Sequence, residues 1–511
     1  MKPKSSCDSC RQRHRKCITR PDATRCNGCD ELDRECTLSP NFQFRPSKFS
    51  GTSNSQKDWA TSPEQQSQSH DPGPDLGSQG CSPAFSYEAE SQSQTSPATE
   101  QESERVSTAA EGRDSIASLQ PSRTRLSGVL TEREAFLYRL WVQKIALISD
   151  AVDDERHFAV TVSRLALEHS VLLNGILGLA SRFDSLANTP QGNVSDMESA
   201  FYHGRCIEIL IDLLGKPTST YDATLLAAVV LSRLYEENDT ETDSLTYHLD
   251  GTSTLLGHEV ITRLASEGGL AEAASWVHLR QAIYIAIVHR QHLSIPLGVY
   301  ESLTAFHKVN DSSYANRVIY LFAQIVQQYF PEQATDTRSS QPDKYWDLLH
   351  RSLDAWFQTK PVSFEPIYYQ APDAAAGEPI PRIWMASTVA TVALQHFYSG
   401  QIIITLQQCS NSLSSGFEAT RALKAKERSI ASNLCILMGL ALSNDQALNA
   451  WYLPCHMLHL CGYVLKSRIE RAQAIQYLQT AKQQIQWKTS PLITALTQQW
   501  AELDGYDTEE R

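Results

Sequence analysis

Residues Cys7 to Cys36 read CDSCRQRHRKCITRPDATRCNGCDELDREC. Its cysteines fall as C-x2-C-x6-C, an eight-residue connection, and C-x2-C-x6-C again, so one short unit is written twice. A structural zinc ion takes four ligands, and a C-x2-C turn supplies two thiolates from adjacent backbone. Two zinc ions need eight ligand positions, which six cysteines fill when two of them bridge. The stretch therefore predicts a closed cluster of two zinc ions, with the ligands Cys7, Cys10, Cys17, Cys26, Cys29 and Cys36.

Two other interpretations compete with this cluster. The two C-x2-C pairs alone have a C-x2-C-x15-C-x2-C spacing that also indicates a single zinc site, but this would leave Cys17 and Cys36 without a metal. A disulfide scaffold is disfavoured because nothing before Cys7 resembles a secretory signal. We therefore expect reduced cysteines and a nuclear protein.

The two units carry opposite charge. The second unit has a net charge of −3 between its last two cysteines, where Asp30, Glu31, Asp33 and Glu35 lie with one arginine. The first unit is basic at the same positions, and only a basic segment is attracted to the phosphates of nucleic acid. A charge run is otherwise typical of a solvated helix face, yet its place inside the zinc unit favours DNA contact. The predicted DNA-binding residues are Arg11, Arg13, His14, Arg15 and Lys16.

The cysteine spacing and the basic run resemble those of the fungal binuclear zinc-cluster (Zn2Cys6) transcription factors. The resemblance implies that Cys7 and Cys26 bridge the metals, that Cys10 and Cys17 complete one site, and that Cys29 and Cys36 complete the other. It also implies that a short helix enters the major groove of double-stranded DNA and reads a CGG triplet.

The same resemblance divides the basic residues by role. Arg11 and Lys16 match positions that grip phosphate, and Arg13 and His14 match the pair nearest the bases. His14 departs from the commonest pattern, which has lysine there. A neutral imidazole offers one donor and one acceptor, so Arg13 is the better partner for guanine O6 and N7.

The charge and composition of the chain divide it into three parts. Residues 1–50 carry eleven Lys and Arg against six Asp and Glu, whereas the full chain of 511 residues has a net charge of −13. Residues 41–124 are dominated by Ser, Gln, Glu, Pro and Gly and cannot bury enough apolar surface to fold. We expect a zinc-cluster domain over 1–40, a disordered linker over 41–124 and an all-α domain over 125–511.

Helical periodicity supports the all-α prediction. Thr131 and Glu134 form a capping-box signature, and period-two alternation is absent. Helices are expected after Thr131, Ser170 and Asp222, and over 276–291, 314–329, 342–357, 383–407, 423–443, 450–466 and 470–485.

Several stretches of this domain resemble the regulatory domain that follows such clusters in fungal regulators. They are DDERHF (153–158), LLNGILGLASR (172–182), LLAAVVLSRLYE (225–236), YHLDGTSTLL (247–256) and YANRVIYL (314–321).

Three groups in the helical domain have the chemistry of a site, although packing is favoured for each. Cys455, His456, His459 and Cys461 could form a second metal site or a core helix. Arg280, His289, Arg290 and His292 could face a pocket. An aromatic set could line a cavity: Trp346, Trp356, Phe357, Phe364, Tyr368 and Tyr369.

Together these patterns predict a nuclear, zinc-dependent regulator of RNA polymerase II transcription that binds promoter DNA and contacts the transcription machinery through its helical domain. We expect no enzymatic activity, because no nucleophile elbow, H-E-x-x-H, phosphate loop or dinucleotide fingerprint occurs. We expect no membrane span, because no run of eighteen apolar residues occurs. A small-molecule sensor and a zinc-dependent protein-interaction module remain alternatives. The sequence leaves the effector and the oligomeric state, a homodimer included, open.

Overall fold

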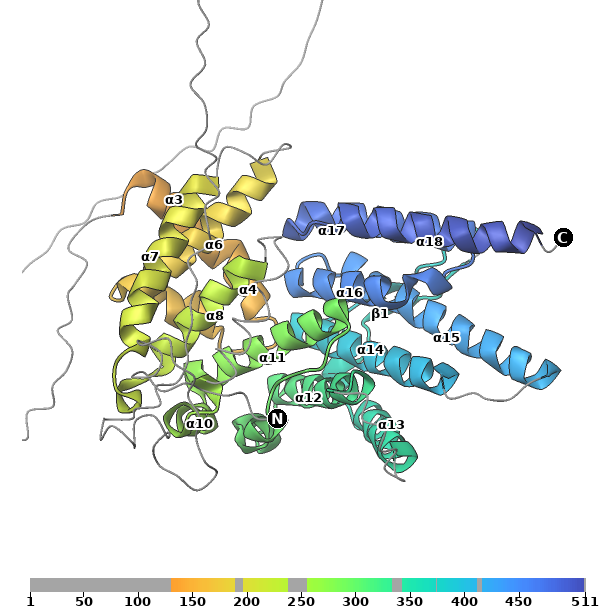
Figure 1. The fold of residues 1–511 in the computed structure, drawn as a ribbon, viewed down its shortest axis with the longest axis horizontal. Helices are drawn as coiled ribbons and strands as arrows, with labels where there is room; N and C mark the ends of the chain where they lie inside the picture. The colour runs from red at the N-terminus through yellow and green to blue at the C-terminus, as the bar shows by residue number, and fades with distance from the viewer. Residues whose placement is uncertain are drawn as a thin grey trace, which may run out of the picture. The chain divides into compact units, whose positions relative to one another are not determined.

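Figure 1 shows the fold of the protein as a computed structural model that describes residues 130–188, 196–237, 255–332, 342–373, 375–410 and 416–509. The predicted zinc ligands, the basic run and the linker lie outside these residues. The described residues belong to the helical domain.

The domain begins with a group of helices built around α6. The members are α3 (Glu132–Leu140), α6 (Ser170–Asn188), α7 (Asp196–Leu214) and α8 (Ala223–Glu237), and α6 packs against the other three (Figure 1). The predicted capping box is confirmed, because Thr131 N donates to Glu134 Oε2 at 2.9 Å and Glu134 N donates to Thr131 Oγ1 at 3.3 Å. The helix predicted after Asp222 is also confirmed, since α8 begins at Ala223 and the Asp222 carboxylate accepts from Leu225 N at 2.8 Å.

Two π-helical segments shape the chain between α3 and α6. Helix α3 runs through η1 (Trp141–Ile145) into α4 (Ala146–Ser149), and η2 (His157–Val162) runs into α5 (Ser163–Ala166). The Asp150 carboxylate joins the two, because it accepts from Phe158 N at 2.8 Å and from Ala159 N at 2.7 Å. Residues 150–157 are thereby held as a tight loop between the two segments.

Helix α11 (Gly269–His289) lies at the centre of the domain. It is buried on nearly all sides and packs against α8, α10 (Glu259–Ser266), α12 (Asp311–Tyr329) and α16 (Tyr452–Cys461). A helix that is apolar all round belongs in the interior of a large fold. The charged and polar residues on α11 are therefore placed inside the protein.

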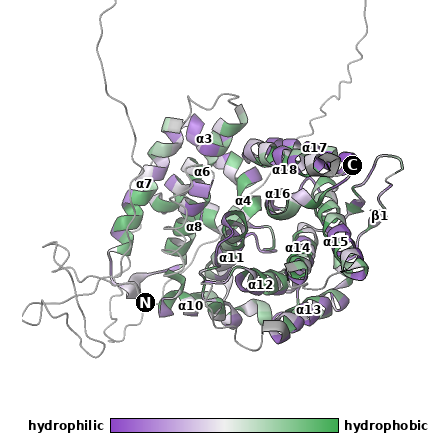
Figure 2. Cartoon of the chain, turned by 45° about the vertical axis from the view of Figure 1, so that its right-hand side comes forward, coloured by the Kyte–Doolittle hydropathy of each residue, from purple (hydrophilic) through white to green (hydrophobic). Residues whose placement is uncertain are grey.

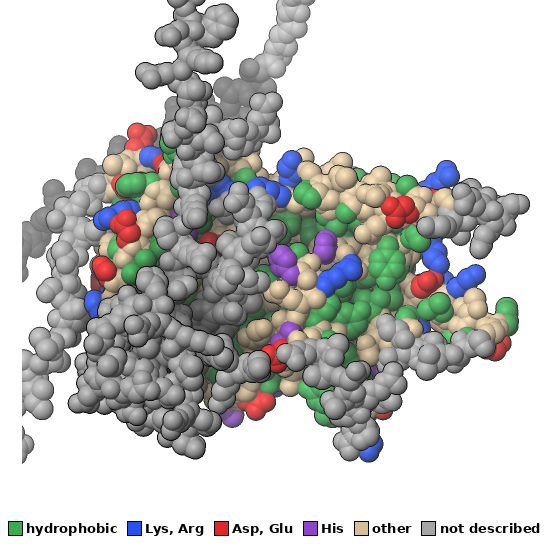
Figure 3. Space-filling model, viewed as in Figure 1, with side chains coloured by type: hydrophobic (Ala, Val, Ile, Leu, Met, Phe, Trp, Pro, Cys, Tyr) green, Lys and Arg blue, Asp and Glu red, His purple; other side chains and the backbone are tan. Residues whose placement is uncertain are grey.

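The C-terminal half is a second group of helices around α14. It contains α13 (Pro342–Gln358), α14 (Thr388–Ser410), α15 (Phe417–Leu442), α17 (Arg468–Ile485) and α18 (Ser490–Glu509). Figure 2 shows mostly apolar colour on α8 and α14 and polar faces on α17 and α18. In Figure 3, hydrophobic side chains gather over the helices α14 to α16, with Lys and Arg beside them.

One helix among the described residues is long and apolar enough to cross a membrane by length and composition alone. It is the stretch Thr388–Cys409 of α14, and 83% of its most apolar window is buried inside the domain. Such burial is what a core helix shows.

The prediction of no strands is wrong in one place. Strand β1 (Tyr368–Gln370) pairs antiparallel with β2 (Arg382–Trp384), with Tyr368 opposite Trp384. Each strand has three residues, too few for period-two alternation to be recognised in the sequence. The predicted helix over 383–407 therefore begins only at Thr388, where the Ser387 hydroxyl accepts from Ala390 N at 3.1 Å.

The described residues are otherwise mostly helical, as predicted. The predicted ranges 276–291, 314–329, 342–357, 423–443 and 470–485 overlap α11, α12, α13, α15 and α17. The range 450–466 is broken into 3-10 turns on either side of α16. Helices α7, α10 and α18 were not predicted.

Candidate functional site

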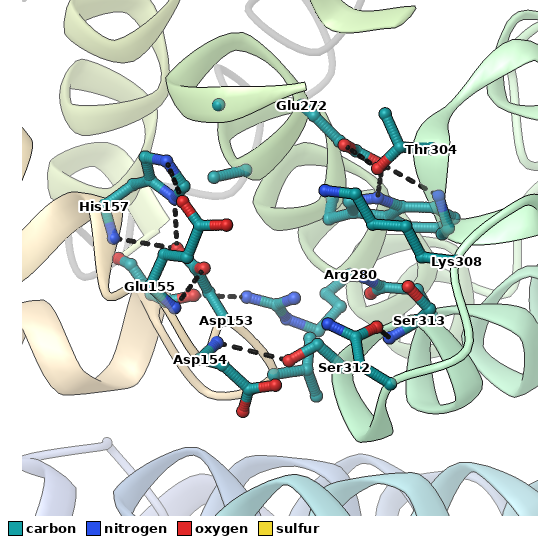
Figure 4. Close-up of a pocket in the computed structure, with 18 residues that line it drawn as sticks. Asp153, Asp154, Glu155, His157, Glu272, Arg280, Thr304, Lys308, Ser312 and Ser313 are labelled. Atoms are coloured by element: carbon teal, nitrogen blue, oxygen red, sulfur yellow. Dashed lines mark hydrogen bonds and ion pairs between the residues drawn. The ribbon is translucent and has the colours of Figure 1, made fainter. Parts of the chain in front are cut away.

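The residues predicted to bind zinc and DNA lie outside the described residues. The candidate site described by the structure is a pocket of about 70 Å³ in the helical domain (Figure 4). The loop at residues 149–157 forms one wall, α11 lies behind, and the turn at 304–313 with the start of α12 forms the other wall. Residues from two stretches singled out in the sequence, 153–158 and 314–321, thus line one pocket. Asp154 N donates to Ser312 Oγ at 3.2 Å and links these walls.

The loop wall is organised by Asp153. Its carboxylate accepts from His157 N at 2.8 Å, from His157 Nδ1 at 2.9 Å and from Glu155 N at 3.1 Å. The hydrogen bond to Asp153 raises the pKa of His157 above its usual value. Burial works to raise the pKa of Asp153, but the His157 bonds outweigh it and hold that pKa below its usual value. The pair is therefore an internal ion pair whose carboxylate is already engaged.

The opposite wall is organised by Glu272 of α11. Its carboxylate accepts from Thr304 Oγ1 at 2.6 Å, from Ala305 N at 3.1 Å and from Trp276 Nε1 at 3.3 Å. Three donors on one carboxylate satisfy most of its hydrogen-bonding capacity. Through these hydrogen bonds Glu272 holds the 304–305 turn against α11.

Arg280 forms the floor of the pocket. Its side chain is buried, and Nη2 donates to Ser149 O at 2.5 Å. Burial lowers the pKa of this guanidinium below its usual value, and the nearby Asp150 charge works in the opposite direction. Burial raises the pKa of Asp150 to about 7, against the effect of its two backbone donors. The arginine thus joins α11 to the end of α4.

Several polar groups in the pocket are not engaged. Ser149 is 3% exposed and Asn316 is 8% exposed, and neither Ser149 Oγ nor Asn316 Oδ1 has a hydrogen-bond partner among the described residues. The Lys308 ammonium has no ion pair among them either. Buried polar atoms are normally satisfied by protein, water or ligand. These three groups are the ones available to a bound molecule.

The predicted polar group on the 276–291 helix is only partly brought together. Arg280 does line a pocket, as the sequence suggested, whereas His289, Arg290 and His292 do not line it. Arg290 ends α11 in the left-handed conformation, with a φ of 51°, and His292 Nδ1 lies 2.8 Å from Phe330 O. Their roles are in the turn after α11.

The predicted aromatic set packs instead of lining a cavity. Trp356 and Phe364 contact Tyr314 at centroid separations of 5.2 and 5.7 Å, and Phe357 stacks on Phe397 at 4.4 Å. Tyr368 lies on the exposed hairpin against Trp384. Trp346 is buried in the core, and Tyr369 borders a separate surface groove.

The packing interpretation of the 455–461 segment is also supported. Cys455 and Cys461 are buried free thiols that donate to Trp451 O and Met457 O, each at 3.2 Å, one helical turn earlier. His456 is buried and packs against Tyr284 and Trp487. Among the described residues no group of three or more His, Cys, Asp or Glu is arranged to hold a metal.

A second buried polar cluster joins α8 to α11. Arg233 Nη1 donates to His278 Nδ1 at 2.6 Å, and Arg233 Nη2 lies 3.6 Å from Glu237 Oε1. Burial, followed by the Arg233 charge, lowers the pKa of His278 well below its usual value, which leaves the imidazole neutral and able to accept. Burial raises the pKa of Glu237 to about 7. These contacts connect two interior helices.

Sequence reasoning missed most of the pocket residues. Asp153 and Asn316 lie in stretches that were singled out, but Ser149, Glu272 and Lys308 carry no local signal, because single polar residues in helices and turns are usually solvated. They come together only through packing of α11 against the loop and α12. Comparison with protein-family models, curated proteins and solved structures found no match. The function is therefore argued from the residues of this chain.

Proposed function

We propose that this protein is a zinc-dependent, sequence-specific DNA-binding regulator of transcription that acts in the nucleus. The observation that carries the proposal is the duplicated C-x2-C-x6-C unit with a basic run in the first copy and an acidic run in the second. Six thiolates bind two zinc ions, and the basic copy faces the phosphates of duplex DNA. The helical domain, which lacks this excess of positive charge, supplies the contact with the transcription machinery.

The metal part of the proposal predicts two zinc ions per full-length chain. Native mass spectrometry of the zinc-loaded protein measures this number directly. Because Cys26 is proposed to bridge both ions, Cys26→Ser should lose both, whereas Cys81→Ser, outside the repeated units, should keep both. One zinc ion in the unaltered protein would favour the single-site interpretation.

The DNA part predicts that zinc-loaded protein selects a common short sequence from a random pool of duplexes. Arg15 and Arg34 occupy the same position in the two units, which makes them a matched pair. Arg15→Ala should weaken duplex binding about threefold to thirtyfold and flatten its salt dependence, since one phosphate contact is lost. Arg34→Ala should leave binding nearly unchanged.

A second pair of variants, at Arg13 and Lys16, distinguishes base reading from phosphate contact. Arg13→Ala should relax the selected sequence, because a bidentate contact to guanine discriminates by about 1–3 kcal/mol. Lys16→Ala should weaken all duplexes alike. Two zinc ions with no duplex bound at low salt would favour the zinc-dependent protein-interaction module.

A further inference from the structure

We propose that the pocket between the 149–157 loop, α11 and α12 binds a small carboxylate that also bears a hydroxyl or amino group. The groups that would hold it are Arg280, Lys308, Asn316 and Ser149, which line the pocket from α11, from the turn and start of α12, and from the loop. Figure 4 labels Arg280 and Lys308 among them. This site belongs to the helical domain and does not depend on the proposed binding of zinc or DNA.

The charges that face the pocket favour an anion. The carboxylate of Asp153 is engaged by His157, and that of Glu272 is engaged by Thr304, Ala305 and Trp276. Asp154 and Glu155 line the same pocket, but Glu155 is paired with His157 at 3.5 Å and its side chain is 72% exposed. Asp154 is exposed, so solvent screens its charge, whereas Arg280 is buried and has no ion pair with a carboxylate among the described residues. Figure 4 shows Arg280 and Lys308 lying toward the space between the two walls.

The hydrogen-bonding groups favour a carboxylate over a simple ion. Arg280 uses only Nη2 in a hydrogen bond to the described residues, at Ser149 O, and a guanidinium has five N–H donors in a planar fork that matches a carboxylate. Lys308 supplies a second, mobile cation. The Ser149 hydroxyl and the Asn316 side-chain oxygen remain for a hydroxyl or amino group on the same ligand. Neither Ser149 Oγ nor Asn316 Oδ1 has a hydrogen-bond partner among the described residues, and both residues are more than nine-tenths buried.

The size of the pocket limits the ligand. A cavity needs about 10–15 Å³ of free space to hold one water, so a volume of about 70 Å³ accommodates roughly five to seven non-hydrogen atoms. Glycolate and lactate fall in this range. Acetate has the carboxylate without the hydroxyl, and glycolamide and lactamide have the hydroxyl without the charge.

The test is calorimetric titration and thermal unfolding of full-length protein with these five compounds. We expect a Kd of about 1 mM, or about −4.1 kcal/mol, which for a ligand of this size is within the ceiling of about −1.5 kcal/mol per non-hydrogen atom. At about 20 mM, glycolate or lactate should raise the unfolding temperature of the helical domain by about 2 °C. Acetate should bind about tenfold more weakly, and the two amides should give no measurable shift.

Two variants assign the binding to this pocket. Lys308 is exposed, so Lys308→Gln should fold normally and weaken lactate binding about tenfold, the loss expected for one charge-assisted hydrogen bond. Lys344→Gln, at an exposed lysine of α13 away from the pocket, is the matched control and should bind as the unaltered protein does. Asn316→Asp keeps the shape of the side chain and adds a negative charge, so it should abolish lactate binding.

The same variants define the results that overturn the proposal. Equal shifts of the unfolding temperature from lactate and lactamide would show that the ligand's charge is not recognised. Equal lactate binding by the Lys308→Gln and Lys344→Gln proteins would show that the ligand does not bind in this pocket. A stronger stabilisation of the unaltered protein by methylammonium than by lactate would make this a cation site. No shift with glycolate or lactate in the unaltered protein would also refute the proposal.

Discussion

Helix α15 contains a glycine that is required for close packing. A Cβ at Gly439 would collide with Pro381 O and lie 3.2 Å from Pro381 Cγ. The hairpin that carries this proline is fixed to the end of α15, because Ile383 N donates to Ser443 Oγ at 3.0 Å and Met385 N donates to the Asn444 side chain at 2.9 Å. The proline therefore cannot withdraw without breaking these bonds.

Gly439→Ala should destabilise the domain. Overpacking costs about 1–3 kcal/mol, and a collision with a fixed backbone oxygen belongs at the upper end of that range, whereas alanine returns about 1 kcal/mol through its better helix propensity. The expected net loss is about 2 kcal/mol in the free energy of unfolding. For a domain of this size the unfolding temperature should fall by about 2–5 °C. Differential scanning calorimetry of the full-length protein measures the change.

Gly204→Ala is the matched control. Gly204 lies within α7, and nothing lies within 4 Å of the position that its Cβ would occupy. Here alanine brings its better helix propensity without a collision, so the substitution should stabilise the protein by about 1 kcal/mol. If Gly439→Ala were as stabilising as Gly204→Ala, the contact between the hairpin and α15 would be refuted.

Three further predictions concern the pocket walls and the buried thiols. Asp153 raises the pKa of His157 above 6.5, so their pairing stabilises the fold below about pH 6.5 and this stabilisation is lost as pH rises through the raised pKa. His157→Gln should therefore make the free energy of unfolding, measured by urea titration, depend less on pH between about pH 6 and 8. Glu272→Ala should lower the free energy of unfolding, measured in urea, by about 2–4 kcal/mol, since it leaves three donors without their acceptor. An unchanged urea midpoint would contradict the role of Glu272 in holding the 304–305 turn. Cys455→Ala and Cys461→Ala should each leave the zinc content of the chain unchanged by mass spectrometry, whereas loss of zinc would restore the metal interpretation of that segment.

Local sequence patterns were sufficient for the helices with strong start signals and long apolar periodicity. Thr131 with Glu134, and Asp222 before an apolar run, predict helix starts because the capping bonds are formed within three residues. The helix at 276–291 was also predicted, although α11 begins earlier, at Gly269, without a side-chain cap. The hairpin was not, because its register depends on Ser443 and Asn444, which lie about sixty residues further along the chain.

The sequence by itself predicts the metal and DNA chemistry of this protein, because six ligands and a basic run lie within thirty residues and their spacing carries the information. Only the tertiary structure decided the pocket. Ser149, Arg280 and the pair Lys308 and Asn316 are distant from one another in the chain, and nothing near any one of these positions indicates the others. Packing of α11 between the 149–157 loop and α12 brings them together, and burial leaves some of their polar atoms without partners. Such a site follows from long-range contacts, which no local pattern records.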